Sequence, residues 1–361
     1  MNRRHLLSLL AAAPFVTTGT VALAQDNPAK LRVALLPDEE RADSAVRSSP
    51  AAAYQPVSRE RTIIYVADPT GHSDPRRYEL AGNFEPEAFS ADEQTLFLLE
   101  YLPPLAPDRY RVMQLNLRAR NGQPQVQPLL TRDKRLNLEE MRGTGRMHAI
   151  APSCRTLYTL YTRQPDHVHA RDMVTLGGSG QSSGMTHAFV HVLSLSEWWA
   201  YCLDLPLPFG VGPSNAHALA PSPDGWRLYV ADASSGQVAV ADTTKLQVTR
   251  VDQVGQLAAG EGADQPAAAT AVGPGGQFYL TNGSETVVAD TTSAGLAATQ
   301  RWSFDSPVRG IQASGDGQYV YVGVEDRVLV LEAKDGRRVS SVPVPGLESI
   351  AHVAQAPAVS T

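Results

Sequence analysis

The stretch Ala220-Pro221-Ser222-Pro223-Asp224-Gly225-Trp226-Arg227-Leu228-Tyr229-Val230-Ala231-Asp232 decides the fold. Residues 222–225 form a Pro/Asp/Gly cluster, which is typical of a tight turn. An apolar run follows at 228–232, and a second one, 238–242, comes after a short Ser/Gly turn. Short apolar runs of this kind between turn residues predict strands, so the stretch predicts antiparallel hairpins.

The same unit recurs along the chain. One of its strands ends in a small acidic or polar residue at six places: Asp68, Asn116, Ser194, Asp242, Asp290 and Glu332. These positions are separated by 48, 78, 48, 48 and 42 residues, and the turn is echoed at 151–158, 273–279 and 314–320. A period of about 45 residues with four short strands per unit predicts a β-propeller, because one unit cannot bury both faces of its sheet.

The repeat predicts an all-β chain that forms a single β-propeller of six blades. Blades two to six are expected at 84–130, 145–205, 214–254, 266–305 and 307–344. The first blade is split: 61–67 and 76–80 are its outer strands, 31–36 can supply the next strand, and the carboxy-terminal residues 350–354 supply the inner strand. That inner strand removes an open sheet edge. Seven blades are also compatible with the sequence if 31–60 contains more strands.

Residues 1–24 have the pattern of an export signal peptide. Arg3 and Arg4 precede a modest apolar segment, and Ala22-Leu23-Ala24 forms an A-x-A cleavage site before Gln25. Paired arginines before a weakly apolar segment favour the twin-arginine route; an ordinary secretory signal with a basic start is the alternative. We therefore expect an exported protein, periplasmic or extracellular.

Composition and charge exclude several classes of protein. The chain has 361 residues, of which 43% are hydrophobic and 19% charged, so it is not intrinsically disordered. Its net charge is −6 with no basic run, which argues against a nucleic-acid partner. No later apolar stretch is long enough to span a membrane. After the signal peptide we expect a strand and flexible loop over 25–60, the propeller over 61–355 and a tail over 356–361.

The segments 228–232 and 240–244 resemble the YVTN-type (YncE-like) repeats of exported bacterial propellers. The turn Ser222-Pro223-Asp224-Gly225 is similar to that of TolB/WD40-like blades. This resemblance covers most of 61–344 and implies the superfamily of the non-catalytic heavy chain of amine dehydrogenases, which also includes lactonases. It specifies a fold and no particular chemistry.

The cysteines and histidines indicate a disulfide or a metal site only weakly. Cys154 and Cys202 are the two cysteines, and in an exported protein they suggest one disulfide within the third blade. The alternative is a pair of inert thiols, because Cys154 is expected in an inner turn and Cys202 in an outer strand. Six of the nine histidines lie between 148 and 217, but none has a strong metal-ligand spacing. We expect no metal and no cofactor.

Loop lengths indicate where binding occurs. The long connections are expected at 101–109, 131–146, 162–186 and 255–266. In the predicted blade order all four emerge on one face, and long loops on a rigid scaffold are the usual place for binding.

When the predicted inner strands of the blades are aligned by sequence, titratable residues fall at equivalent positions. His148 and His217 both begin a His-Ala-aliphatic-Ala-Pro-Ser segment, and Glu87 and Arg309 match them in blades two and six. We expect Glu87, His148, His217 and Arg309 to surround the channel mouth as a ligand site, with His352 from the closing strand as a further member. The alternative is that Glu87 and Arg309 pair while the histidines cap the blades.

These patterns favour a non-enzymatic exported propeller that binds an unknown protein partner or small ligand at its loop-rich face. A lactonase-like hydrolase or a redox-associated propeller subunit is the alternative. No catalytic motif such as G-x-S-x-G or C-x-x-C-H occurs. The adjacent Trp198 and Trp199 suggest either a docking patch or a packed core.

Overall fold

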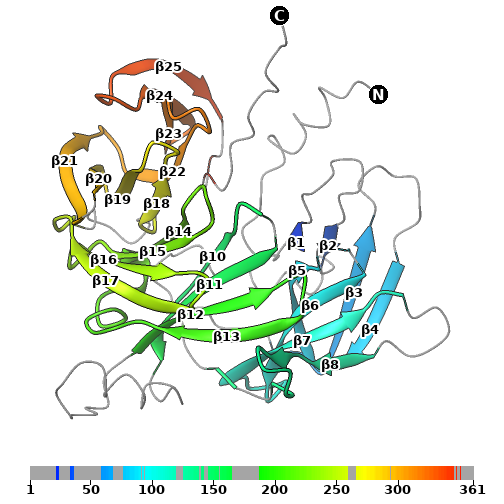
Figure 1. Ribbon diagram of the computed structural model, residues 1–361. Helices are drawn as coiled ribbons and strands as arrows, with labels where there is room; N and C mark the ends of the chain where they lie inside the picture. Colours follow the sequence, from blue (N-terminus) through cyan, green and yellow to red (C-terminus); the bar gives the residue numbers. More distant parts are fainter. Residues whose placement is uncertain are drawn as a thin grey trace, which may run out of the picture. The chain divides into compact units, whose positions relative to one another are not determined.

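The computed structural model describes residues 22–23, 33–35, 58–67, 76–90, 92, 94–118, 125–137, 140–141, 145–153, 155–164, 187–258, 266–292, 294–344, 347 and 350. The chain divides into two compact units (Figure 1). The amino-terminal unit comprises the described residues of 18–214 and 241–249, and the carboxy-terminal unit comprises those of 215–240 and 250–361.

The amino-terminal unit contains three sheets of mostly antiparallel strands. The first has the order β1 (Ala22–Leu23), β2 (Val33–Leu35), β3 (Arg61–Ala67), β4 (Arg76–Ala81). The second has the order β5 (Asn83–Phe89), β6 (Thr95–Leu102), β7 (Arg109–Asn116), β8 (Val126–Pro128). The third has the order β10 (Gly145–Ile150), β11 (Thr156–Gln164), β12 (His187–Ser194), β13 (Trp199–Asp204), β9 (Leu130–Thr131).

Three further four-stranded sheets follow a short 3₁₀ turn, Ser214–Ala216. The fourth sheet consists of β14 (His217–Pro221), β15 (Arg227–Asp232), β16 (Gln237–Asp242) and β17 (Gln247–Gln253). The fifth consists of β18 (Ala269–Val272), β19 (Gln277–Asn282), β20 (Glu285–Thr292) and β21 (Gly295–Ser303). The sixth consists of β22 (Val308–Ala313), β23 (Tyr319–Val324), β24 (Arg327–Glu332) and β25 (Arg338–Pro343).

Five of the six sheets have the strand order that the repeat predicts, a meander in which strands follow one another, and the third sheet has this order with β9 added beside β13. Within the carboxy-terminal unit the first strands β14, β18 and β22 lie side by side, as expected of consecutive propeller blades. The all-β fold with several antiparallel sheets is therefore confirmed. Blade number and ring closure remain predictions.

Two elements differ from expectation. The innermost strand of the first sheet is β1, which pairs with β2, whereas the sequence analysis assigned this place to 350–354. In the uncleaved chain Ala22–Leu23 pairs with an edge of β2 that would otherwise be open, and removal of the predicted signal peptide 1–24 takes this pairing away. Ile350 is not in a strand, and 351–354 lie outside the described residues, so closure by this segment stays a prediction. The second difference is β9, a fifth strand that arises within the expected loop 131–146 and its flank.

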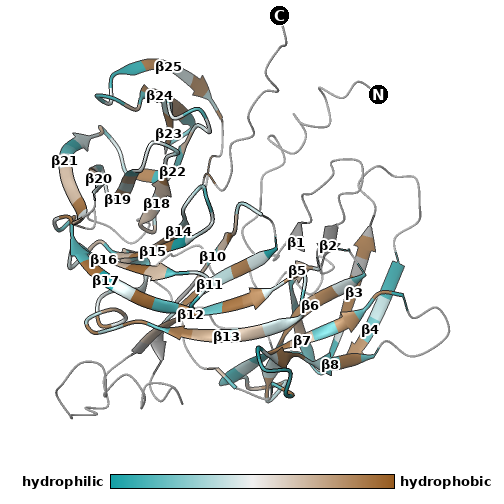
Figure 2. Ribbon diagram, in the orientation of Figure 1, coloured by the Kyte–Doolittle hydropathy of each residue, from teal (hydrophilic) through white to brown (hydrophobic). Residues whose placement is uncertain are grey.

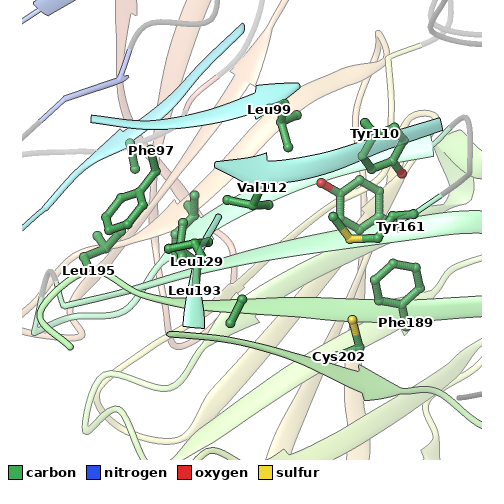
Figure 3. Packing of buried hydrophobic residues seen from close by; sticks show 14 of the residues in the cluster. Phe97, Leu99, Tyr110, Val112, Leu129, Tyr161, Phe189, Leu193, Leu195 and Cys202 are labelled. Carbon is green, nitrogen blue, oxygen red and sulfur yellow. The ribbon is translucent and has the colours of Figure 1, made fainter. Parts of the chain in front are cut away.

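The second and third sheets share a hydrophobic core (Figure 3). Phe97, Leu99 and Val112 come from the second sheet and meet Phe189 and Leu193 of the third. Burying each large side chain stabilises the fold by about 1.5–3 kcal/mol, which holds the two sheets together. Figure 2 shows hydrophobic colour along β6, β12 and β13, which contribute to this core.

A hydrogen-bonded turn, here called the Ser-Asp box, joins the first two strands of three sheets. In the fourth sheet the Ser222 hydroxyl donates to the Asp224 carboxylate and accepts from the Arg227 amide at 3.0 Å. The Trp226 amide also donates to Asp224, at 3.0 Å. The hydrogen bond from Ser222 is the main cause that lowers the pKa of Asp224, so this carboxylate is charged at neutral pH.

The second and sixth sheets repeat this box with other residues. The amide of Thr95 donates to the Ser90 hydroxyl at 3.0 Å, and Ser90 donates to Asp92 at 2.7 Å. The amide of Tyr319 donates to Ser314 at 2.9 Å, and Ser314 donates to Asp316 at 2.6 Å. In each case the serine hydroxyl accepts a hydrogen bond from a backbone amide and donates one to the aspartate, which fixes the position of the hydroxyl.

The box generates a stability prediction. We expect Ser222→Ala to lower the free energy of unfolding by about 1 kcal/mol, because the partly buried amide of Arg227 loses its side-chain acceptor and Asp224 loses a donor. Urea unfolding followed by fluorescence measures this change. Ser303→Ala, at an exposed position of β21, is the control and leaves the midpoint unchanged. Equal midpoints for both variants would contradict the role given to the box.

Candidate functional site

The strongest polar cluster of the amino-terminal unit consists of Glu87, His148 and Thr159. The Thr159 hydroxyl donates to Glu87 Oε1 at 3.2 Å. His148 Nδ1 lies 3.1 Å from the same hydroxyl oxygen and 3.5 Å from Glu87 Oε1. The sequence analysis predicted that Glu87 and His148 would lie near each other, and this geometry places them in direct contact.

Local structure explains how the three side chains converge. His148 on β10 and Thr159 on β11 are cross-strand partners, so their side chains lie on the same face of the third sheet. Glu87 lies on β5 where the strand register shifts between Pro86 and Ala88. A bulge of this kind redirects a side chain, and such irregularities are common next to functional sites.

Burial differs sharply across the cluster. The Glu87 side chain is 2% exposed, whereas that of His148 is 37% exposed. A buried carboxylate is costly unless hydrogen bonds or an opposite charge compensate it, and Thr159 and His148 provide this compensation. The result is a fixed imidazole that reaches solvent while one of its nitrogens faces a buried acid.

The hydrogen-bond pattern assigns the tautomer of His148. A carboxylate only accepts, so the Thr159 hydroxyl hydrogen is directed to Glu87. The Thr159 oxygen and Glu87 Oε1 are then both acceptors toward His148 Nδ1, which must carry a hydrogen. In the neutral ring Nε2 is consequently the acceptor nitrogen.

A row of side chains continues from this cluster across the third sheet. His191 on β12 is the cross-strand partner of Thr159, and Cys202 on β13 is the partner of His191. His191 and Cys202 are buried, and the Tyr161 ring lies 6.5 Å from the His191 ring at an edge-on angle. Sequence reasoning had noted His191 only as one of several histidines. Thr159 was missed, although a threonine among large apolar residues in a buried strand is a detectable signal.

The other predicted site residues belong to the carboxy-terminal unit or are not described. His217 is fully buried and pairs across the strands with Asp232, which is also buried. Arg309 is half-buried and lies where the register of β22 shifts between Val308 and Gly310, a bulge analogous to that of Glu87. His352 lies outside the described residues. The predicted ring of four residues therefore stays a prediction; what the structure gives is the contact between Glu87 and His148.

Cys154 also lies outside the described residues, so the disulfide with Cys202 stays a prediction. Among the residues that the structure describes, no three His, Cys, Asp or Glu side chains are grouped so that they could hold a metal ion. Within the same part of the chain, no helix has the length and apolar character needed to cross a membrane.

No protein-family model matches the sequence, and no curated protein matches it. Solved structures do resemble the fold. The periplasmic gluconolactonase PpgL of Pseudomonas aeruginosa is 18% identical with a TM-score of 0.47, over 91% of this chain and 86% of that one. The β-propeller domain of Cps50 (Swd1) from Myceliophteria thermophila is 10% identical with a TM-score of 0.44, over 80% and 82%.

A third solved structure, a protein of unknown function from Desulfotomaculum acetoxidans, is 14% identical with a TM-score of 0.42, over 78% of this chain and 76% of that one. These matches accompany an all-β architecture of repeated sheets. At such identities and scores they carry no argument about chemistry.

The tautomer of His148 is directly testable. We expect nitrogen-15 NMR of the neutral imidazole to show the hydrogen on Nδ1, because two acceptor oxygens face that atom. Thr159→Val together with Glu87→Gln removes this preference, and the Nε2–H tautomer, which is usual in water, then gains population. A wild-type ring with its hydrogen on Nε2 would contradict the assigned network.

Proposed function

We propose that this chain is an exported β-propeller protein that binds a small ligand or a partner group at Glu87 and His148 without chemical turnover. The observation that carries the proposal is the half-exposed imidazole whose Nδ1 is held by a buried hydroxyl–carboxylate pair. A side chain fixed in this way binds with less loss of conformational entropy than a mobile one.

The chemistry of the site suggests which ligands it accepts. The His148 side chain is 37% exposed, and Nε2 of the neutral ring is an acceptor, so a ligand that binds this nitrogen supplies a hydroxyl or amine donor. When His148 is protonated, Glu87 balances the charge at a distance of 3.5 Å from Nδ1. Polyols, sugars and amines have suitable donor groups.

One observation favours a second candidate function. A carboxylate that orients an imidazole through Nδ1 leaves Nε2 as a general base, which is the arrangement that activates water or a hydroxyl nucleophile in hydrolases. The resemblance of the repeats to those of lactonases makes a lactone the appropriate substrate to test. This hydrolase reading uses the same residues as the binding reading.

The binding proposal is tested with purified protein lacking residues 1–24. A panel of polyols, sugars, aldonic acids, aldonolactones and amines is screened by thermal shift, and hits are measured by calorimetry. We expect His148→Ala to weaken a hit about tenfold, the loss expected for one hydrogen bond to a charged or well-oriented group. Glu87→Gln, which keeps the shape but removes the charge, weakens amines more than sugars.

Controls separate the two functions. Glu325→Gln alters an exposed glutamate of the carboxy-terminal unit and leaves binding unchanged. A pH-stat assay with D-gluconolactone, corrected for spontaneous hydrolysis, tests the second function. Turnover that disappears in His148→Ala establishes the hydrolase and rejects the non-enzymatic reading. A panel without hits and without turnover rejects the site.

Export is proposed from Arg3, Arg4 and the A-x-A site at Ala22–Leu23–Ala24. We expect Arg3→Lys with Arg4→Lys to retain the precursor in the cytoplasm, because the twin-arginine pathway reads the paired guanidinium groups. Fractionation followed by immunoblotting measures the distribution. Normal export of this double variant would indicate the general secretory route, and mass spectrometry of the exported chain shows whether it begins at Gln25.

A further inference from the structure

The outer edge of the third sheet exposes an aromatic patch that the proposed binding site does not use. Trp198, Tyr201 and Leu136 are 39%, 41% and 64% exposed. Trp199 lies between them and is partly buried. We refer to Leu136, Trp198, Trp199 and Tyr201 as the edge patch. The sequence analysis left open whether the two tryptophans form a docking patch or a core, and their exposure favours the first.

Strand pairing shows that most of this patch is continuous. Leu130 of β9 is the partner of Trp199 on β13, and a β-bridge joins Leu130 to Leu136. Paired residues lie on the same face of a sheet, and Tyr201 shares that face because it follows Trp199 by two positions. Leu136, Leu130, Trp199 and Tyr201 therefore form an apolar strip across the sheet edge. Exposed apolar strips bordered by polar groups mark interaction surfaces.

The turn that carries Trp198 contains local strain. Trp198 has a φ of 60°, and its amide donates to Ser194 O at 3.0 Å. The equivalent turns of the fourth and sixth sheets place Leu246 (φ 54°) and Gly336 (φ 73°) in the same left-handed conformation, with amides donating to Asp242 O and Glu332 O, both at 2.9 Å. Glycine adopts this conformation without steric cost, whereas a bulky residue does not.

The three turns differ in how far burial of the left-handed residue offsets its backbone strain. Leu246 is 5% exposed, so its burial offsets the strain. Trp198 remains 39% exposed and recovers much less. Trp198 therefore keeps its ring at the surface in a conformation whose cost its burial offsets only in part.

Basic residues beside the edge patch indicate the charge of the partner that it binds. The β9 hairpin tip carries Arg132, Lys134 and Arg135 against Asp133, a local excess of two positive charges on a chain with a net charge of −6. The Arg132 guanidinium lies 5.8 Å from the centre of the Trp199 ring. Glu197, the nearby acid, accepts a hydrogen bond from the Trp199 indole at 2.9 Å. Lys134 and Arg135 are exposed at the tip.

We propose that the edge patch docks an acidic segment of a partner protein that carries aromatic or aliphatic side chains among carboxylates. Tryptophan, tyrosine and arginine are the residues that contribute most to protein interfaces, and the basic tip complements the carboxylates. This interaction is independent of the Glu87–His148 site.

The test uses a defined probe, a random copolymer of glutamate and tyrosine, titrated into the exported protein and followed by calorimetry. We expect saturable binding that weakens as salt increases, and no binding of a lysine–tyrosine copolymer. Trp198→Gly removes the ring but relieves the strain, so it weakens binding by about fivefold or more while the melting temperature stays equal or rises. Lys134→Glu weakens binding and reduces its salt dependence.

The matched control is Trp226→Ala, which removes a tryptophan that is 63% exposed in the carboxy-terminal unit. It leaves copolymer binding unchanged. The proposal is overturned if the wild-type protein does not bind the copolymer, or if Trp198→Gly binds as tightly as wild type. Binding of a neutral oligosaccharide in place of the copolymer would overturn it as well, because the patch would then be a carbohydrate platform.

Discussion

The Ser-Asp box is the interaction on which the positions of the other residues depend. In the second, fourth and sixth sheets, one serine hydroxyl accepts a backbone amide five residues later and donates to an aspartate two residues later. This arrangement fixes the number of residues in the turn between the first two strands. A slip of one residue would move every side chain of a strand to the opposite face. In these three sheets the box therefore helps to set which residues reach the core.

Where the box is modified, the backbone still follows the same path. In the fifth sheet the amide of Gly273 donates to Gln277 O at 2.8 Å, although Gly273 has no hydroxyl. In the third sheet Ala151 donates to Thr156 O at 2.9 Å, and no aspartate follows. The register is preserved there by the buried strands themselves. The third sheet also carries His148 and Thr159 of the first functional candidate, to which the second sheet contributes Glu87, and it carries the edge patch at its outer edge.

The two candidate sites depend on different physical interactions. Glu87 and His148 combine a buried charge with a half-exposed ring, so their contribution depends on hydrogen bonds that hold one geometry. The edge patch combines apolar area with a basic tip, so its contribution depends on desolvation and on charge complementarity. Both are built on the second and third sheets, which share a packed hydrophobic core, and this rigidity lets small sets of side chains act as fixed sites.

The sequence by itself determined the strands, the tight turns and the repeated sheet order, because alternation and Pro/Asp/Gly turns are local signals. It also placed Glu87 and His148 at matching positions of two inner strands. Only the tertiary structure decided that a register shift beside Pro86 directs Glu87 to Thr159 and His148, since a bulge leaves no mark in residue spacing. The β9 strand and the exposure of Trp198 could likewise not be predicted from the sequence, because both depend on contacts between segments that lie 69 residues apart, as Leu130 and Trp199 do.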